Sequence, residues 1–437
     1  MSKFDKFADA MSLAAEKIDG NKYLSVIKNA FSTFMPFIIV GSFASLGNYV
    51  LTNTTTGLAR FSVFSFLTNL APAFTALNFA TMNIITLGIV VLMGILLARK
   101  NKGNELLSAL VALSAYIAVV PQSTSVTVEE QLYTASGLPV ASTNASGLFV
   151  GMILTLVVVE LFNRLCNVER LKIKMPAAVP PAISRSFNAL IPVVIILFIV
   201  GIAGRVYVIL TGDYINETIY AILQRPMEFF LQTPTGTIGL AIFSQLFWAV
   251  GIHGGLVISA IRAPIMASAL AENIEAVANG LTPMNPITMS TWRAFINIGG
   301  GGLVLSLAIC LLLFSKREDG RAIGKLGLIP SIFSISEPIA FGLPLVLNPL
   351  YVVPYVLSAG VSSVIVILAF NIGFLTPNFV DVPYGLPIII NAFLGWGWRG
   401  VVVQIIIIAA GVLTYLPFVL VHNRQEVHEV AETGGEQ

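Results

Sequence analysis

Long apolar runs alternate with short polar segments along this chain of 437 residues. Examples are LGIVVLMGILLA (87–98) and VVVQIIIIAAGVLTYLPFVLV (401–421). An apolar run of about 20 residues lets one helix cross a bilayer. The pattern predicts ten such helices, roughly at residues 31–51, 79–98, 106–121, 147–166, 187–210, 236–252, 254–272, 298–314, 350–370 and 400–421.

The composition supports a membrane protein. Hydrophobic residues make up 56% of the chain and charged residues only 11%, whereas soluble domains carry roughly 25% charged residues. The fold class expected is therefore an all-α polytopic membrane protein.

The N-terminus is polar but periodic. Apolar residues recur there with helical spacing, at Phe4, Phe7, Met11, Ala15 and Ile18. This spacing predicts a short amphipathic helix on the membrane surface. A mitochondrial-type presequence is the alternative, and the acidic residues in this stretch argue against it.

The basic residues set the orientation. With the N-terminus inside and ten spans, most of the 24 lysines and arginines fall in inner segments. Inner loops of membrane proteins are enriched in these residues. We therefore expect a multi-pass protein of a bacterial plasma membrane with both termini cytoplasmic. The outer loop 122–146 has no Lys or Arg, and its alternating VTV pattern and Gly137 predict a short hairpin.

Two apolar stretches do not fit as spans. Residues 326–348 and 371–397 are each broken by three prolines, and a single crossing by either would reverse the charge alternation. Each is expected to enter and leave on the same side, as a re-entrant hairpin. Irregular backbone at membrane depth is tolerated where it is buried in protein or lines a wet cavity, and it often carries a transporter's binding site.

Both broken stretches lie in the second half of the chain, so we expect two domains of different character. We expect a surface helix and lead-in at 1–30, a scaffold domain at 31–215, a substrate-transport domain at 216–421 and a cytoplasmic tail at 422–437. Each of the two central domains would hold five spans. Residues 211–234 read as a mostly helical connector between them.

Glu337 is the strongest candidate for a functional residue. It lies in SISEPIAFGLP, an otherwise apolar stretch, and an acid at the bilayer centre costs about 2.5–3.5 kcal/mol. Pro338 disfavours helix just before it. Glu337 is thus expected where a helix stops, beside free backbone groups that could receive a polar ligand. A helix cap or an inter-helix hydrogen bond is the structural alternative.

Four further residues are weaker candidates. His253 lies among glycines between two spans, where a ligand can approach the backbone closely. Trp248 could stack on the apolar face of a sugar ring or simply pack. Asn297 and Asn391 carry amides that suit sugar hydroxyls.

Other chemistries lack the residues they need. One His and one Glu do not make a metal-ligand set, and GGGG (299–302) lacks the Lys-Ser/Thr of a phosphate loop. We therefore expect no metal, no cofactor and no nucleic-acid partner. Cys166 and Cys310 form no CxxC pair and read as core residues.

Three blocks together resemble a known family. WAVGIHGG (248–255), FINIGG (295–300) and SISEPIAFGLPLVLNP (334–349) are similar to the enzyme IIC permease component of the bacterial sugar phosphotransferase system. The similarity is to its lactose/cellobiose/diacetylchitobiose group, and it covers nearly the whole chain.

The resemblance implies a fold and a function. The fold would have ten transmembrane helices and a homodimer interface made by the first five. The protein would import a β-linked disaccharide of the cellobiose, chitobiose or lactose type, coupled to phosphorylation by a separate phospho-IIB protein, itself supplied by IIA. Because the chain would be the permease subunit of a phosphotransferase complex, whether it counts as an enzyme by itself stays open.

The resemblance also implies residue roles. Glu337 would accept hydrogen bonds from sugar hydroxyls, and His253 would lie near the hydroxyl that becomes phosphorylated. Asn297 and Trp248 would line the same pocket, and Tyr384 would stack on the sugar. Many members have Trp-Thr-Thr-Pro where this chain reads Tyr384-Gly385-Leu386-Pro387, which puts the exact sugar in doubt.

Rival functions make different demands. An ion-coupled sugar symporter would also use a buried acid and broken helices, but it would leave its sugar unphosphorylated. An intramembrane enzyme would need a complete catalytic set, and a receptor would need an output domain. Neither is visible in the sequence.

Overall fold

The computed structural model describes residues 21–433, except 56, 129–130, 174–186, 250–253, 344, 346–348 and 384. Three predictions lie outside the described residues: the surface helix near the N-terminus, His253 and Tyr384. The described residues form two compact units. The N-terminal unit comprises residues 20–228 and 263–271, and the C-terminal unit comprises residues 229–262 and 272–437.

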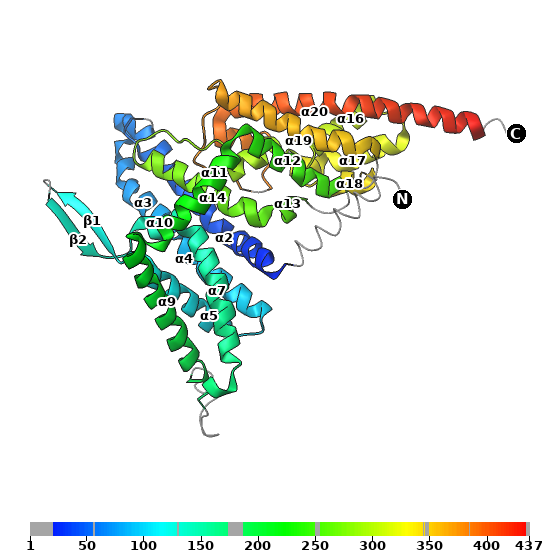
Figure 1. The fold of residues 1–437 in the computed structure, drawn as a ribbon. Helices are drawn as coiled ribbons and strands as arrows, with labels where there is room; N and C mark the ends of the chain where they lie inside the picture. Colours follow the sequence, from blue (N-terminus) through cyan, green and yellow to red (C-terminus); the bar gives the residue numbers. More distant parts are fainter. Residues whose placement is uncertain are drawn as a thin grey trace. The chain divides into compact units, whose positions relative to one another are not determined.

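The N-terminal unit is a bundle of apolar helices with one hairpin attached (Figure 1). Helix α4 packs against α2, α5 and α7, and α5 and α7 both pack against α9. The helical elements are α2 (Lys22–Gly47), η1 (Asn48–Thr52), η2 (Leu58–Arg60), η3 (Ser62–Leu70), α3 (Ala71–Phe79), α4 (Ile85–Lys100), α5 (Glu105–Val119), α6 (Val140–Thr143), η4 (Ala145–Gly147), α7 (Leu148–Cys166), η5 (Glu169–Leu171), α9 (Leu190–Thr211), α10 (Ile215–Ile219) and η6 (Tyr220–Gln224).

Side-chain caps start α2 and α5. The side chain of Asn21 accepts hydrogen bonds from the backbone of Tyr23 and Leu24 at the start of α2. Asn104 accepts one from Leu107 at the start of α5. Such caps satisfy backbone N–H groups that have no partner in the first turn and contribute about 1 kcal/mol each.

The predicted hairpin and connector are both confirmed. Strands β1 (Ser123–Val128) and β2 (Gln131–Ser136) pair antiparallel, with Ser123 opposite Ser136. The connector is helical through most of its length, as α10, η6 and α11 (Arg225–Gln232).

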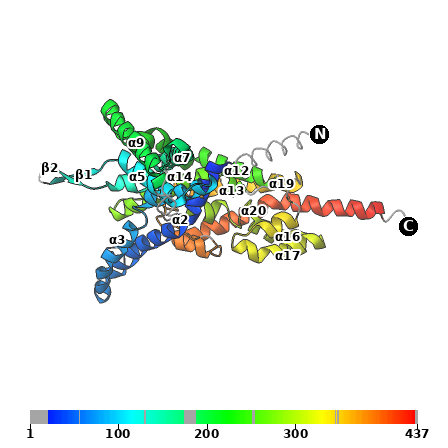
Figure 2. The ribbon, with the colours of Figure 1, turned by 90° about the horizontal axis from the view of Figure 1, so that it is seen from below.

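The C-terminal unit mixes long helices with irregular segments. Helix α19 packs between α12 and α20, and α16 packs between α20 and α17. Its helical elements are α12 (Pro234–Ala249), α13 (Gly254–Val257), α15 (Met289–Thr291), η7 (Trp292–Ile296), α16 (Val304–Phe314), α17 (Glu318–Ile332), α18 (Glu337–Gly342), α19 (Pro349–Asn371) and α20 (Ile390–Thr433). Helix α14 (Ser259–Ala278) is divided between the units, because its residues 263–271 belong to the N-terminal one. Figures 1 and 2 both show α20 continuing past the other helices of this unit.

Several helices are long and apolar enough to cross a membrane. Among the described residues there are five, at Lys22–Thr52, Ala145–Cys166, Leu190–Thr211, Leu350–Asn371 and Ile390–Asn423. The structure thus supports the predicted multi-pass membrane protein. Shorter apolar helices overlap two other predicted spans, at Glu105–Val119 and Val304–Phe314. The second begins six residues later than predicted, because residues 298–303 form an irregular turn. The total of ten spans, the re-entrant path of the broken segments and the homodimer stay predictions.

The second broken segment ends where the sequence suggests. The described residues of the range 373–389 form no regular helix. Helix α20 then begins, but its backbone leaves the helical region at Gly397, with φ 61° and ψ −152°. Only glycine adopts such a conformation readily, so Gly397 separates a short helix from the long apolar one.

The expectation for the backbone at Glu337 needs one correction. Helix α17 ends earlier, at Ile332, and Glu337 opens the next short helix, α18. A helix therefore starts at this acid instead of stopping there. Pro338 explains the position, because a proline in the first helical turn has no N–H that needs a partner.

Candidate functional site

The glycine run 299–302 is the centre of the candidate site. It joins η7 to α16, and three of its residues have positive φ: Gly299 at 83°, Gly300 at 107° and Gly302 at 55°. Leu303 follows at 51°. Because L-residues with a side chain rarely adopt these angles, the run can make a tight, irregular turn that an ordinary sequence could not.

One face of this turn lies against the segment that leads into Glu337. A Cβ atom on Gly300 would lie 2.5 Å from the backbone oxygen of Ser334 and 3.0 Å from the backbone nitrogen of Ser336. Only a glycine permits this approach. The turn and the start of α18 are therefore in direct backbone contact.

Another face lies against buried polar atoms of α12 and α19. A Cβ atom on Gly301 would lie 3.4 Å from both Gln245 Oε1 and Trp248 Nε1, and 2.6 Å from the Tyr355 hydroxyl. Trp248 is buried in the apolar core of this unit, and its ring is tilted against that of Tyr355 at a centroid distance of 6.5 Å. In this structure Trp248 packs behind the glycine turn.

Asn297 holds the turn from its N-terminal side. Its side-chain amide donates a hydrogen bond to the backbone oxygen of Gly300. Asn297 is half-buried, and its side-chain oxygen has no hydrogen bond among the described residues. Asn297, Trp248 and the start of the helix of Glu337 thus meet at one turn.

Asn391 belongs to a neighbouring network. The side chain of Gln404 donates hydrogen bonds to Asn391 Oδ1 at 2.9 Å and to the backbone oxygen of Ala294 at 2.6 Å. Its oxygen accepts from the backbone of Ile389 at 2.6 Å. Gln404 therefore ties α20 to η7, the element directly before Asn297.

A buried ion pair was missed by the sequence reasoning. Arg293 Nη1 lies 3.2 Å from Asp381 Oδ1, and the two side chains are only 14% and 4% exposed. Arg293 also donates to the backbone oxygen of Val382 at 2.9 Å, and Ser290 binds both Asp381 and the backbone of Val382. Charged residues within membrane segments are costly and usually functional. This rule could have identified Asp381 from the sequence.

Backbone strain is concentrated around this site. Of the four described non-glycine residues with positive φ, three lie in this unit: Leu303, Ser334 (62°) and Ile389 (79°). A β-branched residue such as Ile389 rarely adopts this conformation. Strained residues persist only where surrounding contacts enforce them, and they cluster at functional sites.

The structure places the predicted residues as follows. It brings Trp248, Asn297 and the segment that leads into Glu337 to the glycine turn, and it places Asn391 nearby through Gln404. For Glu337 only the backbone is described, and His253 and Tyr384 lie outside the described residues. The assignment of these residues to one sugar site stays a prediction.

The family follows from comparison with known proteins. The family described as "Phosphotransferase system, EIIC" matches residues 28–359. The chain belongs to this family. An EIIC protein is a permease component of a sugar phosphotransferase system, so the resemblance drawn from the three sequence blocks is confirmed.

Two relatives of this EIIC protein match it along almost their whole length. The oligo-β-mannoside-specific EIIC component of Bacillus subtilis (strain 168) is 28% identical, over 99% of this chain and 98% of that protein. The cellobiose-specific EIIC component of Geobacillus stearothermophilus is 30% identical, over 96% and 94%.

A solved structure shares the fold. It is the crystal structure of the transporter ChbC, the IIC component from the N,N'-diacetylchitobiose-specific phosphotransferase system. It is 29% identical to this chain and covers 97% of it, with 98% of that chain covered in turn and a TM-score of 0.88.

Proposed function

We propose that this EIIC protein imports a β-linked disaccharide of the cellobiose, chitobiose or lactose type, coupled to its phosphorylation by a separate IIB protein. Relatives named for cellobiose and for oligo-β-mannosides, and the solved relative named for N,N'-diacetylchitobiose, support this class of substrate.

The observation that carries the proposal is the glycine turn. Residues that are far apart in the sequence, Trp248, Asn297 and the segment leading into Glu337, all meet it. An irregular backbone buried in protein at membrane depth is where transporters place their substrates. The strained residues around the turn fit a preorganised binding site.

The chemistry assigns each residue a role. Glu337 accepts hydrogen bonds from sugar hydroxyls, and the free side-chain oxygen of Asn297 accepts another. Tyr384 stacks on the sugar ring, while the burial of Trp248 favours support of the turn over stacking. Asn391 contributes its amide from the neighbouring network.

His253 completes the set near the reacting hydroxyl. Phosphoryl transfer needs mainly positioning and charge stabilisation, so His253 and Glu337 need only orient this hydroxyl towards phospho-IIB or take up its proton. The product carries a phosphate and binds less well beside Glu337, which promotes its release inside the cell.

Translocation follows from the two predicted domains. The substrate-transport domain (216–421) moves as a body against the scaffold domain (31–215), through which two copies form a homodimer. Both termini are cytoplasmic in this arrangement. Sugar is bound from outside and phosphorylated inside.

Transport with labelled sugars tests the proposal. Membrane vesicles are loaded with the soluble phosphotransferase proteins, a matching IIB and phosphoenolpyruvate, and then offered a panel of labelled β-linked disaccharides. We expect one sugar to appear inside as its phosphate, and only when IIB is present.

Two results would contradict the proposal. Free sugar that accumulates only under an ion gradient would favour the symporter. Phosphorylation of monosaccharides alone would reject the disaccharide, and the Tyr384-Gly385-Leu386-Pro387 stretch would then be the first place to look for the cause.

A further inference from the structure

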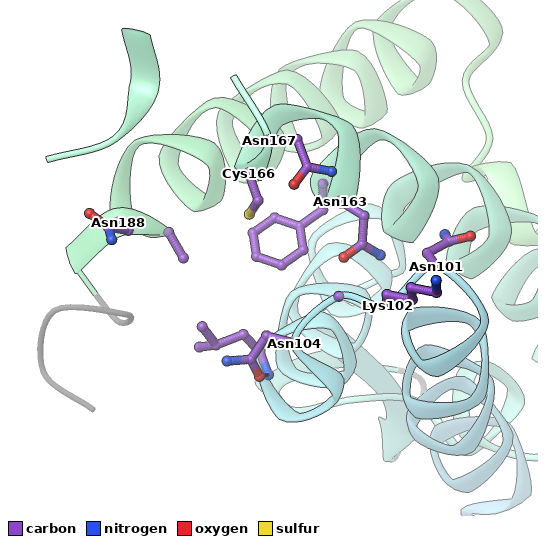
Figure 3. A pocket seen from close by; sticks show the side chains of 11 residues that line it. Asn101, Lys102, Asn104, Asn163, Cys166, Asn167 and Asn188 are labelled. Carbon is purple, nitrogen blue, oxygen red and sulfur yellow. Dashed lines mark hydrogen bonds between the residues drawn. The ribbon is translucent and has the colours of Figure 1, made fainter. Parts of the chain in front are cut away.

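A polar cavity lies in the N-terminal unit, outside the site described above. It is bounded by the turn between α4 and α5, the end of α7 and the residues just before α9, and it measures about 160 Å³ (Figure 3). A single buried water needs about 10–15 Å³. The cavity is therefore large enough for a ligand of several non-hydrogen atoms.

Asn163 supplies a side-chain oxygen that can accept a hydrogen bond in this cavity. Its side chain is only 6% exposed, and its Nδ2 donates to the backbone oxygen of Val159 at 2.9 Å. Its Oδ1 has no hydrogen bond among the described residues. Figure 3 shows the side chain reaching from α7 towards the loop of Lys102 and Asn104. An amide oxygen that faces a cavity can accept a hydrogen bond from a ligand hydroxyl.

Other amides around the cavity are also available. Asn167 and Asn188 line it, and neither side chain has a hydrogen bond among the described residues. By contrast, Asn101 is already bonded to Lys22 and Glu160, and Asn104 caps α5. The open groups can both donate and accept, as vicinal hydroxyls require.

The charge at the cavity is positive. Lys102 lines it in a left-handed conformation, with φ 57°, and has no ion pair among the described residues. None of the described lining residues carries a carboxylate. Two other basic residues near the cavity are paired elsewhere: Arg99 with Glu105 at 2.8 Å and Lys172 with Glu169 at 2.6 Å. Lys102 lines the cavity and can bind an anion there.

The geometry points to a binding site for a hydroxylated phosphate ester, with the phosphate at Lys102 and a hydroxyl donating to Asn163 Oδ1. A glycerol headgroup of an anionic phospholipid has this chemistry. The cavity lies at the ends of α7 and α9, both of which are long and apolar enough to cross a membrane. Lipid headgroups lie at that level, and basic pockets at helix ends bind them.

The site is tested with soluble short-chain lipids added to the purified full-length protein. The probes are dihexanoyl phosphatidylglycerol, the matching phosphatidylcholine and glycerol 3-phosphate, with binding measured by native mass spectrometry and thermal shift. We expect the phosphatidylglycerol to bind more tightly than the phosphatidylcholine. We also expect Lys102→Gln to weaken it about fivefold, the effect of one basic residue at a membrane surface.

Lys100→Gln is the matched control, because it removes the same charge from a residue that does not line the cavity. It should change binding less than twofold. Asn163→Leu should also weaken the binding of phosphatidylglycerol while leaving the binding of phosphatidylcholine unchanged. Glycerol 3-phosphate binding as tightly as the lipid would support the same chemistry with a soluble source. Equal binding of the two lipids, or equal effects of the two lysine variants, would overturn the site.

Discussion

The two compact units of this protein satisfy their backbone hydrogen-bonding groups in different ways. In the N-terminal unit, regular helices such as α4, α5 and α7 satisfy their own backbone groups. In the C-terminal unit, the glycine turn and the segments before α18 and α20 have irregular backbone. Side chains such as Asn297, Ser290 and Gln404 bind that backbone instead.

One ion pair from each unit differs in burial. Arg99 and Glu105 in the N-terminal unit are 62% and 37% exposed, whereas Arg293 and Asp381 in the C-terminal unit are 14% and 4% exposed. Regular helices need no such buried pairs, since their hydrogen bonds are internal. The buried pair of Arg293 and Asp381 joins η7 to the irregular segment before α20.

The largest expected effect tests this difference between ion pairs. Arg293→Met leaves Asp381 buried without its partner, and such a loss costs about 3–5 kcal/mol. Arg99→Met should cost at most about 1 kcal/mol because exposed pairs contribute little. Thermal unfolding in detergent measures both. The double variant Arg293→Met/Asp381→Asn should recover much of the loss, and equal shifts for the two single variants would break the contrast.

The next effect concerns the proposed sugar site. Glu337→Gln removes a charged hydrogen-bond acceptor, and such bonds are worth about 1.5–3 kcal/mol, so sugar affinity should fall about 10- to 100-fold. The unfolding midpoint should change little. Glu105→Gln, on the exposed acid of the other unit, is the control and should bind sugar normally. Unchanged affinity in Glu337→Gln would remove Glu337 from the site.

A smaller effect is expected from replacing glycines by alanine, and it should depend on whether the added Cβ atom meets neighbouring atoms. Gly300 and Gly373 both have positive φ, at 107° and 72°, but a Cβ atom meets close backbone only at Gly300. Gly373→Ala should lose about 1–2 kcal/mol of stability from backbone strain alone and keep its transport rate. Gly300→Ala should in addition lose about tenfold in sugar phosphorylation, roughly 1.4 kcal/mol in activation free energy. Similar rates for the two variants would argue against the turn as the site.

The smallest effect shows whether burial, and not membership of a unit, decides the strength of an ion pair. The hydrogen bond from Arg317 lowers the pKa of the Asp319 carboxyl below its ordinary value, and this side chain is 55% exposed. Its contribution is therefore present at neutral pH and is lost as the pH falls below about 4, the ordinary range of aspartate.

Because exposed pairs are screened by solvent, that loss should stay under about 1 kcal/mol. Unfolding midpoints measured at pH 6 and pH 3 check it, and Asp319→Asn should reduce the difference between them. A larger difference in Asp319→Asn than in the parent protein would contradict the assignment.

The sequence by itself determined the class and the family of this protein. Apolar runs long enough to cross a bilayer, few charges and prolines in two stretches are local properties that need no tertiary contact. The β-hairpin near Gly137, the helical connector and the change of course at Gly397 also follow from local preferences of the chain. The blocks around Trp248, Asn297 and Glu337 were enough to indicate the family.

Only the tertiary structure decided how those blocks are arranged. Gly300 contacts Ser334 and Gly301 faces Trp248 because glycines lack the side chain that would prevent it, and spacing along the chain does not encode such contacts. The pairing of Arg293 with Asp381 joins segments that are distant in sequence. Likewise, the free oxygen of Asn163 becomes visible only when α7 packs beside the α4–α5 turn, because whether a buried polar atom finds a partner depends on the neighbours that folding brings to it.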